Sequence, residues 1–150
     1  MDYFLKIDGI QGESRDAKHK DEIELVSFGW GVARGSGGGS GGGSGRARFD
    51  PFHFTMRTNK ASPQLFLATV SGKHVKEASL SVRRAGKQAL EYLKIKFSDL
   101  IVSSFQEGGG QEPPEELIAF DYGRIEIEYS AQRAGGAVKA GWDVKKNVKI

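Results

Sequence analysis

Apolar and polar residues alternate with a period of two along most of the chain. This is the pattern of β-strands that have one buried and one exposed face. The alternating stretches lie at residues 3–8, 23–33, 52–56, 78–82, 93–102, 125–129 and 142–144. About seven short strands at this spacing predict an all-β protein with an antiparallel sandwich or barrel architecture.

Two of these stretches change their alternation midway. The second stretch does so between Leu25 and Val26, which predicts a β-bulge. Beyond that point one face carries large side chains, including Trp30, which we expect in the core. The opposite face carries only small residues: Ser27, Gly29, Gly31 and Ala33. The fifth stretch shifts near Ser98 and Asp99, so it should expose apolar side chains on both of its faces.

One segment has helical rather than strand spacing. Ser62 is a good N-cap, Pro63 suits the first helical position, and Gly72 can end the helix in the left-handed conformation. The predicted apolar stripe consists of Leu65, Phe66, Thr69 and Val70. A helix of about two turns is unstable alone in water, so we expect it to dock on the sheet.

Two loops stand out by composition. Gly35–Gly45 contains only glycine and serine, so we expect it to be flexible and dispensable for folding. The second loop, Gln106–Glu116, contains three consecutive glycines and two prolines. Neither loop separates two segments that could each form a core, so we predict a single domain over residues 1–150, with flexible loops at 35–45 and 106–116.

Composition narrows the functional classes. Apolar residues make up 38% of the chain and charged residues 27%, which is typical of soluble globular proteins. No apolar run reaches the roughly 18 residues of a membrane helix, and the first residues do not resemble a secretory signal, so we expect neither membrane insertion nor a cleaved signal peptide. The net charge of +3 is mild. We therefore interpret Arg83-Arg84 and Lys145-Lys146 as solvated edge-strand residues rather than as a nucleic-acid site.

The chain shows no recognisable catalytic constellation. It has no cysteine, and its three histidines, His19, His53 and His74, lack partners at metal-ligand spacing. We expect His53 simply to point to the opposite face from its neighbours Phe52 and Phe54. No catalytic, cofactor or metal residue is therefore assigned, and we expect a protein that is not an enzyme. A small-ligand-binding barrel and a hydrolase or nuclease with a dispersed site stay open as alternatives.

Several strings, taken in order, resemble one known family. They are FLKIDGIQGES at 4–14, FGWG at 28–31, KASPQL at 60–65, SGKH at 71–74, EYLKI at 91–95, VSS at 102–104, and AGWDV at 140–144 with Asn147. Together they cover most of the chain and are similar to the haemolysin-coregulated protein (Hcp) family, the tube protein of bacterial type VI secretion. The regular repeat in Gly35–Gly45 departs from the family, which carries a variable loop there.

The resemblance implies a fold and a function. The expected fold is a compact antiparallel β-barrel of two sheets with one short helix, assembled as a ring. Stacked hexameric rings would form a tube that carries or chaperones small effector proteins in its channel. The implied partners are further copies of the chain, the contractile sheath proteins, the spike protein and the effectors. The implied localisation is the bacterial cytoplasm, followed by export without a cleaved signal peptide.

Candidate ring contacts follow from the strand faces. The small-residue face of the second stretch lets another surface approach closely, and the Leu90–Phe105 stretch exposes apolar side chains on both faces. Trp142 lies in the last short stretch. The candidate ring-interface residues are Ser27, Gly29, Gly31, Ile101, Ser103, Ser104 and Trp142. We expect both long loops to take part in ring stacking.

Overall fold

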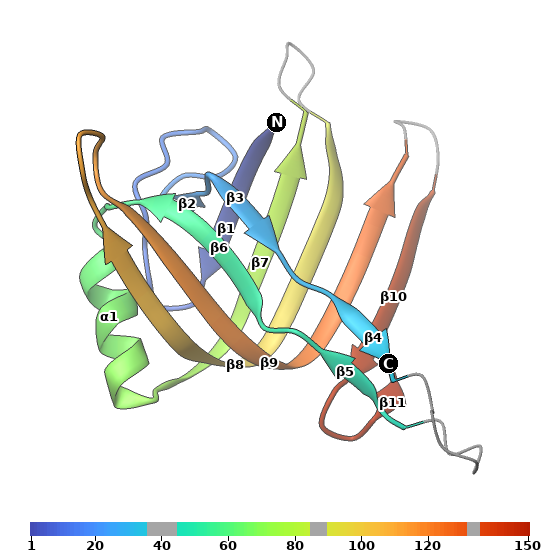
Figure 1. Ribbon diagram of the computed structural model, residues 1–150. Helices are drawn as coiled ribbons and strands as arrows, with labels where there is room; N and C mark the ends of the chain where they lie inside the picture. Colours follow the sequence, from blue (N-terminus) through green and yellow to red (C-terminus); the bar gives the residue numbers. More distant parts are fainter. Residues whose placement is uncertain (36–44, 85–89, 132–135) are drawn as a thin grey trace.

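The computed structural model describes residues 1–35, 45–84, 90–131 and 136–150 (Figure 1). Residues 36–44, most of the predicted Gly/Ser loop, lie outside the described residues. The elements are β1 (Asp2–Ile7), β2 (Ile23–Glu24), β3 (Ser27–Gly29), β4 (Val32–Arg34), β5 (Ala47–Phe49), β6 (Phe52–Arg57), α1 (Ser62–Ser71), β7 (His74–Arg83), β8 (Glu91–Gly108), β9 (Glu115–Ser130), β10 (Ala137–Asp143) and β11 (Val148–Lys149).

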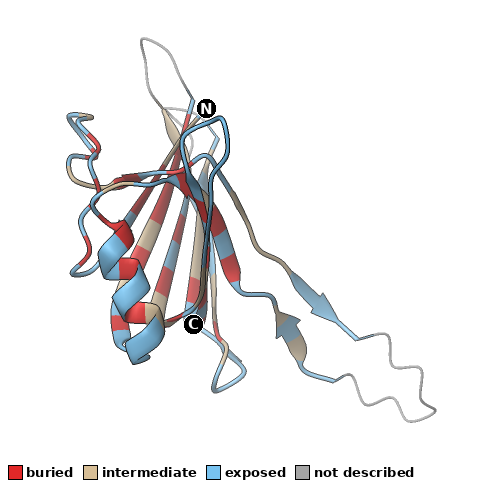
Figure 2. Cartoon of the chain, turned by 60° about the vertical axis from the view of Figure 1, so that its left-hand side comes forward, coloured by how far each residue is buried: buried red, intermediate tan, exposed pale blue. Residues whose placement is uncertain are grey.

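The described strands form two antiparallel sheets of very unequal size. The large sheet runs β11-β10-β9-β8-β7-β1-β2, and β6 joins it by pairing with both β9 and β3. The small sheet is the two-stranded ribbon β4-β5, which projects from the body (Figure 2). The all-β prediction with two sheets and one helix is confirmed. The large sheet is strongly curled, but one continuous ladder does not close it into a barrel.

The change of alternation between Leu25 and Val26 is a change of partner strand, so the predicted bulge is wrong. The Leu25 amide donates to the Tyr3 carbonyl at 2.9 Å, on the β1 side. The next amide, that of Val26, donates to the Thr55 carbonyl at 2.8 Å, on the β6 side. Residues 23–29 therefore pair first with β1 and then with β6, and this is how the sheet curls round.

The predicted shift at Asp99 is confirmed as a corner shared by two strands. Asp99 has a left-handed φ of 57° and lies with Gly123 between the register pairs Ser98–Arg124 and Leu100–Tyr122. A Cβ on Gly123 would lie 3.0 Å from the Asp99 carboxylate, so a side chain there would press on Asp99. Lys145 first, and then His74, lowers the pKa of Asp99 by hydrogen bonding. The alternation of buried and exposed side chains shifts in both strands at this corner, so the two strands stay paired in the same register beyond it.

The helix is present, but its buried face differs from the predicted stripe. It begins at Ser62 and its N-cap is Ala61, which makes no side-chain cap. The buried residues are Ser62, Leu65 and Ala68. Phe66 and Val70, both predicted to be buried, are 53% and 64% exposed. Gly72 ends the helix with a left-handed φ of 66°, as predicted. The Phe66 ring lies edge-on to Phe105 of β8, 6.2 Å between ring centroids.

The core is built around four phenylalanines. Phe52, Phe54, Phe97 and Phe120 are at most 1% exposed, and Phe52 lies 4.8 Å from Phe97 and 5.0 Å from Phe120 between ring centroids. Side chains thus fill the centre of the curled sheet, which disfavours the ligand-binding barrel. Trp30 packs against this core but is only partly buried, so its prediction as a core residue is wrong. No described helix is long and apolar enough to cross a membrane.

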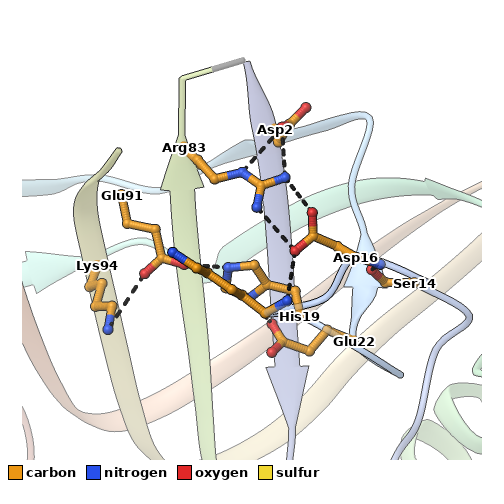
Figure 3. Close-up of polar contacts among 9 residues, drawn as sticks. Asp2, Ser14, Asp16, His19, Glu22, Arg83, Glu91 and Lys94 are labelled. Atoms are coloured by element: carbon orange, nitrogen blue, oxygen red, sulfur yellow. Dashed lines mark hydrogen bonds and ion pairs between the residues drawn. The ribbon is translucent and has the colours of Figure 1, made fainter. Parts of the chain in front are cut away.

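A cluster of charged groups holds the loop between β1 and β2 over the outer face of β1 (Figure 3). Phe4 is buried on that face, stacked on His19 at 4.3 Å and covered by the Arg83 guanidinium at 4.9 Å from the ring centroid. Arg83 also binds Asp16 at 2.6 Å and Asp2 at 3.1 Å. Arg83 is therefore buried and paired, not solvated as predicted. The neighbouring Arg84 is exposed.

His19 completes this cluster. Its Nδ1 lies 3.0 Å from a carboxylate oxygen of Glu22, and its Nε2 bonds to Glu91 at the start of β8. Glu22 belongs to the loop and Glu91 to β8, so His19 contacts carboxylates from two separate segments. His19 therefore joins the loop to β8, two strands away from β1 in the sheet.

Asp16→Asn should remove part of the acid sensitivity of the protein. The Arg83 hydrogen bond lowers the pKa of Asp16 from 3.8 to about 2. A depressed folded-state pKa stabilises the fold above the unfolded-state value, and this stability is lost as the pH falls through the folded-state value. The wild-type melting temperature should therefore fall more steeply than that of Asp16→Asn between about pH 4 and pH 2. Glu13→Gln, an exposed change in the same loop, should keep the wild-type slope; equal slopes in all three proteins would contradict the assignment.

Candidate assembly surfaces

The first surface is the continuation of the core face beyond the core. Trp142 of β10 is paired with Ile125 of β9, which is paired with the core residue Phe97. Directly paired residues of antiparallel strands point to the same side of the sheet. The same side of the sheet continues from Trp142 to the residues two and four positions beyond Ile125 in β9 and to their partners. We call this surface the arm face; it consists of Leu93, Ile127, Tyr129, Val138, Ala140 and Trp142.

The arm face is apolar and largely uncovered. Val138 is 71% exposed and Tyr129 is 46% exposed, whereas Trp142, nearer the core, is partly buried. In Figure 1, β10 lies at the side of the sheet away from α1, so the helix does not cover this end. Contiguous apolar side chains that continue a core outward are typical of a surface that another protein covers.

The second surface is the outer side of β3, β6, β9 and β8, which we call the polar sheet face. One row across these strands is Gly29, His53, Ala119 and Ser104, and the next is Ser27, Thr55, Leu117 and Gln106. Ile101 is paired with Asp121 in a third row, which lies on the other side of the Gly29 row from the Ser27 row. Ser103 is the extra residue where the register shifts, and its hydroxyl donates to the Ala119 carbonyl at 3.3 Å.

The structure thus brings five of the seven predicted contact residues onto one face. Trp142 lies instead on the arm face, and Gly31 lies between β3 and β4, outside both rows. Sequence reasoning placed Trp142 in the last strand but not on a particular face. It missed Val138 and Tyr129, although the alternation of Ile125, Ile127 and Tyr129 gives a signal that the apolar side continues.

The small residues of the second predicted strand are not bare, because other side chains of the same chain lie over them. A Cβ on Gly29 would lie 2.5 Å from the imidazole of His53, and a Cβ on Gly31 would lie 3.0 Å from the Asp50 carboxylate. The Ser27 hydroxyl bonds to that of Thr55 at 2.6 Å. His53 is exposed, which confirms that it points away from Phe52 and Phe54. This face is therefore flat and polar.

The residues that could do chemistry are engaged elsewhere. His74 hydrogen-bonds to Asp99 at the corner, and His19 lies between two glutamates. Across the part of the chain that the structure describes, no three His, Cys, Asp or Glu side chains come close enough together to hold a metal ion. The two surfaces suit contact with other proteins, and their geometry assigns no reacting group.

The comparisons with known proteins agree on one family. The family model described as "Type VI secretion system effector, Hcp" matches residues 4–129. Protein hcp1 of Pseudomonas aeruginosa is 35% identical over 99% of this chain and 98% of its own length. The crystal structure of Hcp1 from Salmonella typhimurium is 39% identical, has a TM-score of 0.89 and covers 99% of this chain and 98% of its own.

A further solved structure supports the same assignment. The type VI secretion system effector from Yersinia pestis is 36% identical, has a TM-score of 0.82 and covers 95% of this chain and all of its own. The fold, the aligned length and the level of identity therefore agree. The chain belongs to the Hcp family, the tube proteins of bacterial type VI secretion.

Proposed function

We propose that six copies of the chain close into a ring, that the rings stack into a tube, and that the channel carries small effector proteins. The observation that carries the ring is the arm face, an apolar surface that continues the core and is uncovered in the single chain. A ring needs a heterologous contact, in which one patch of each copy meets a different patch of the next. The arm face supplies the apolar centre of such a contact.

The polar sheet face contributes to the same ring wall. Its members Ser27, Gly29, Ile101, Ser103 and Ser104 are those predicted from sequence, and the face they belong to is mostly polar, with Leu117 as an exposed apolar residue. Polar residues of this kind occupy the rim of a protein contact or border water. In the proposed ring they flank the arm-face contact and border the channel, where an effector would meet small and polar side chains.

The other proposed partners follow from the family. We infer that the tube contacts the contractile sheath and the spike protein, and that the chain is made in the bacterial cytoplasm and exported without a cleaved signal peptide. The β4-β5 ribbon and the tip between β8 and β9 are the proposed stacking elements. Strand pairing continues to Gly108 and resumes at Glu115, so the tip, residues 109–114, is shorter than the predicted loop.

The absence of cysteine allows a direct test of the ring contact. Val138→Cys places a single thiol on the arm face, and Leu67→Cys places one on the exposed side of α1, where Leu67 is 56% exposed. In the assembled particle the thiol at 138 should react with a maleimide at least about tenfold more slowly than after dilution to monomers, because a neighbour covers it. The thiol at 67 should react equally fast in both states. Equal rates at 138 would contradict the proposed contact.

A further inference from the structure

Glu116 is a buried carboxylate with one unused oxygen. It is fully buried at the start of β9, on the inner side of the sheet beside Met56. The Thr58 hydroxyl donates to Oε2 of Glu116 at 2.7 Å. The other oxygen, Oε1, has no hydrogen-bond partner among the described residues. A buried polar oxygen without a donor is unfavourable, so a group that donates a hydrogen bond to it is expected nearby.

The group opposite is a second carboxyl. Glu107 of β8 is paired directly with Glu116, so both side chains lie on the same side of the sheet. The neighbouring Glu116 carboxyl, and then desolvation, raise the pKa of Glu107. Two neighbouring carboxylates repel each other when both are ionised, and one proton between them removes the repulsion.

No cation balances this pair among the described ion pairs, none of which includes Glu107 or Glu116. From β6, the pair is faced by Met56 and by the Thr58 hydroxyl, both uncharged. Arg57 lies opposite Glu115 in the strand register, and both side chains are on the other side of the sheet. Together with Glu112 in the tip, these two residues are the charged groups around the hollow on that side.

The pair lies at the base of the tip between β8 and β9. The tip is joined to the end of β6 by the Thr58 amide, which donates to the Pro114 carbonyl at 3.3 Å. Thr58 therefore contacts both the tip, through its amide, and Glu116, through its hydroxyl. Thr58 thus links the carboxyl pair to the tip.

We propose that Glu107 and Glu116 share one proton, and that this proton keeps the tip at residues 109–114 closed against the end of β6. The protonated Glu107 donates its O–H to Oε1 of Glu116, which gives the unused oxygen its partner. When the proton leaves, two adjacent carboxylates remain, and their repulsion opens the base of the tip. The proposal depends on the fold of one chain and not on ring formation.

The direction of the pH dependence follows from linkage. A carboxyl whose pKa is raised in the closed state binds its proton more tightly there than in the open state. The closed tip is therefore favoured in acid, and this preference is lost as the pH rises through the raised value. Each pKa unit by which the closed state holds the proton more tightly changes the opening equilibrium tenfold.

Hydrogen–deuterium exchange followed by mass spectrometry tests whether the shared proton keeps the tip closed. Exchange in peptides covering residues 105–117, corrected for the intrinsic pH dependence, should rise at least about tenfold between about pH 5 and pH 8 in the wild type. In Glu107→Gln the amide can donate to Glu116 at every pH, so exchange should stay slow throughout. In Glu107→Ala neither the shared proton nor the second carboxylate remains, so the pH dependence of exchange should be lost.

Glu115→Gln is the matched control. It removes one negative charge from the neighbouring residue of the same strand, on the opposite side of the sheet, and should keep the wild-type pH dependence. Circular dichroism of each variant confirms that the fold is intact, and exchange in the β1 peptide provides an internal reference. A wild-type exchange rate that does not change with pH would overturn the proposal. A Glu107→Gln variant that follows the wild type, or a Glu115→Gln variant that loses the dependence, would do the same.

Discussion

Phe97→Ala should lower the free energy of unfolding by about 3–5 kcal/mol, the range for truncating a buried phenylalanine. The Phe97 ring is fully buried and lies 4.8 to 5.2 Å, between centroids, from Phe52, Tyr122 and Phe120. Its removal leaves a cavity among rings that the surrounding strands hold in place. Urea unfolding followed by tryptophan fluorescence measures the loss.

Phe66→Ala provides the comparison for this prediction. The same side chain is removed, but Phe66 is 53% exposed on α1 and contacts one aromatic neighbour, Phe105. The loss of stability should be about 1 kcal/mol or less. Similar losses in the two variants would show that the aromatic cluster is not the centre of the core.

Val138→Asp should convert the assembled ring into folded monomers. Val138 is the most exposed residue of the arm face, so a carboxylate there should cost the single chain little. In the ring it would be buried without a partner, which costs several kcal/mol at every contact. Light scattering should therefore show loss of the ring, while circular dichroism and the melting temperature of the monomer stay unchanged. A persistent ring would place the contact elsewhere.

Gly29→Glu tests the polar sheet face in the same assay. The new side chain would meet the imidazole of His53, which is exposed and can rotate away, so the chain should still fold. A charge on the wall should weaken the ring, though less than Val138→Asp does, because this face exposes fewer apolar side chains than the arm face. A ring unaffected by Gly29→Glu would exclude this face from the contacts between subunits.

Alternation predicted most strands but not their partners. A β-bulge and a change of partner strand give the same shift in the alternation of apolar residues. The shift after Leu25 therefore could not be distinguished from the shift at Asp99. The first half of β9 was missed because a carboxylate, Glu116, occupies its first inward position and breaks the apolar pattern. The prolines and glycines just before it also favoured a loop.

How deeply a side chain is buried was harder to predict than the face of the strand on which it lies. Trp30 packs against the core, but it lies between β3 and β4 and is only partly buried there. Ion pairs between distant segments, such as that of Arg83 with Asp16, leave no local pattern in a sequence. The polar sheet face was largely predictable because it follows from strand parity. The arm face was not, because it depends on how far the core extends under β9 and β10.

The mass of the particle in solution tests the central claim most directly. Sedimentation velocity of the purified wild-type chain at micromolar concentration measures it without labels or mutations. The proposed ring predicts one dominant species of about six times the 16.3 kDa chain mass, which Val138→Asp reduces to the mass of one chain. A wild-type protein that sediments as a single 16.3 kDa species at these concentrations would contradict the assembly proposed for this chain.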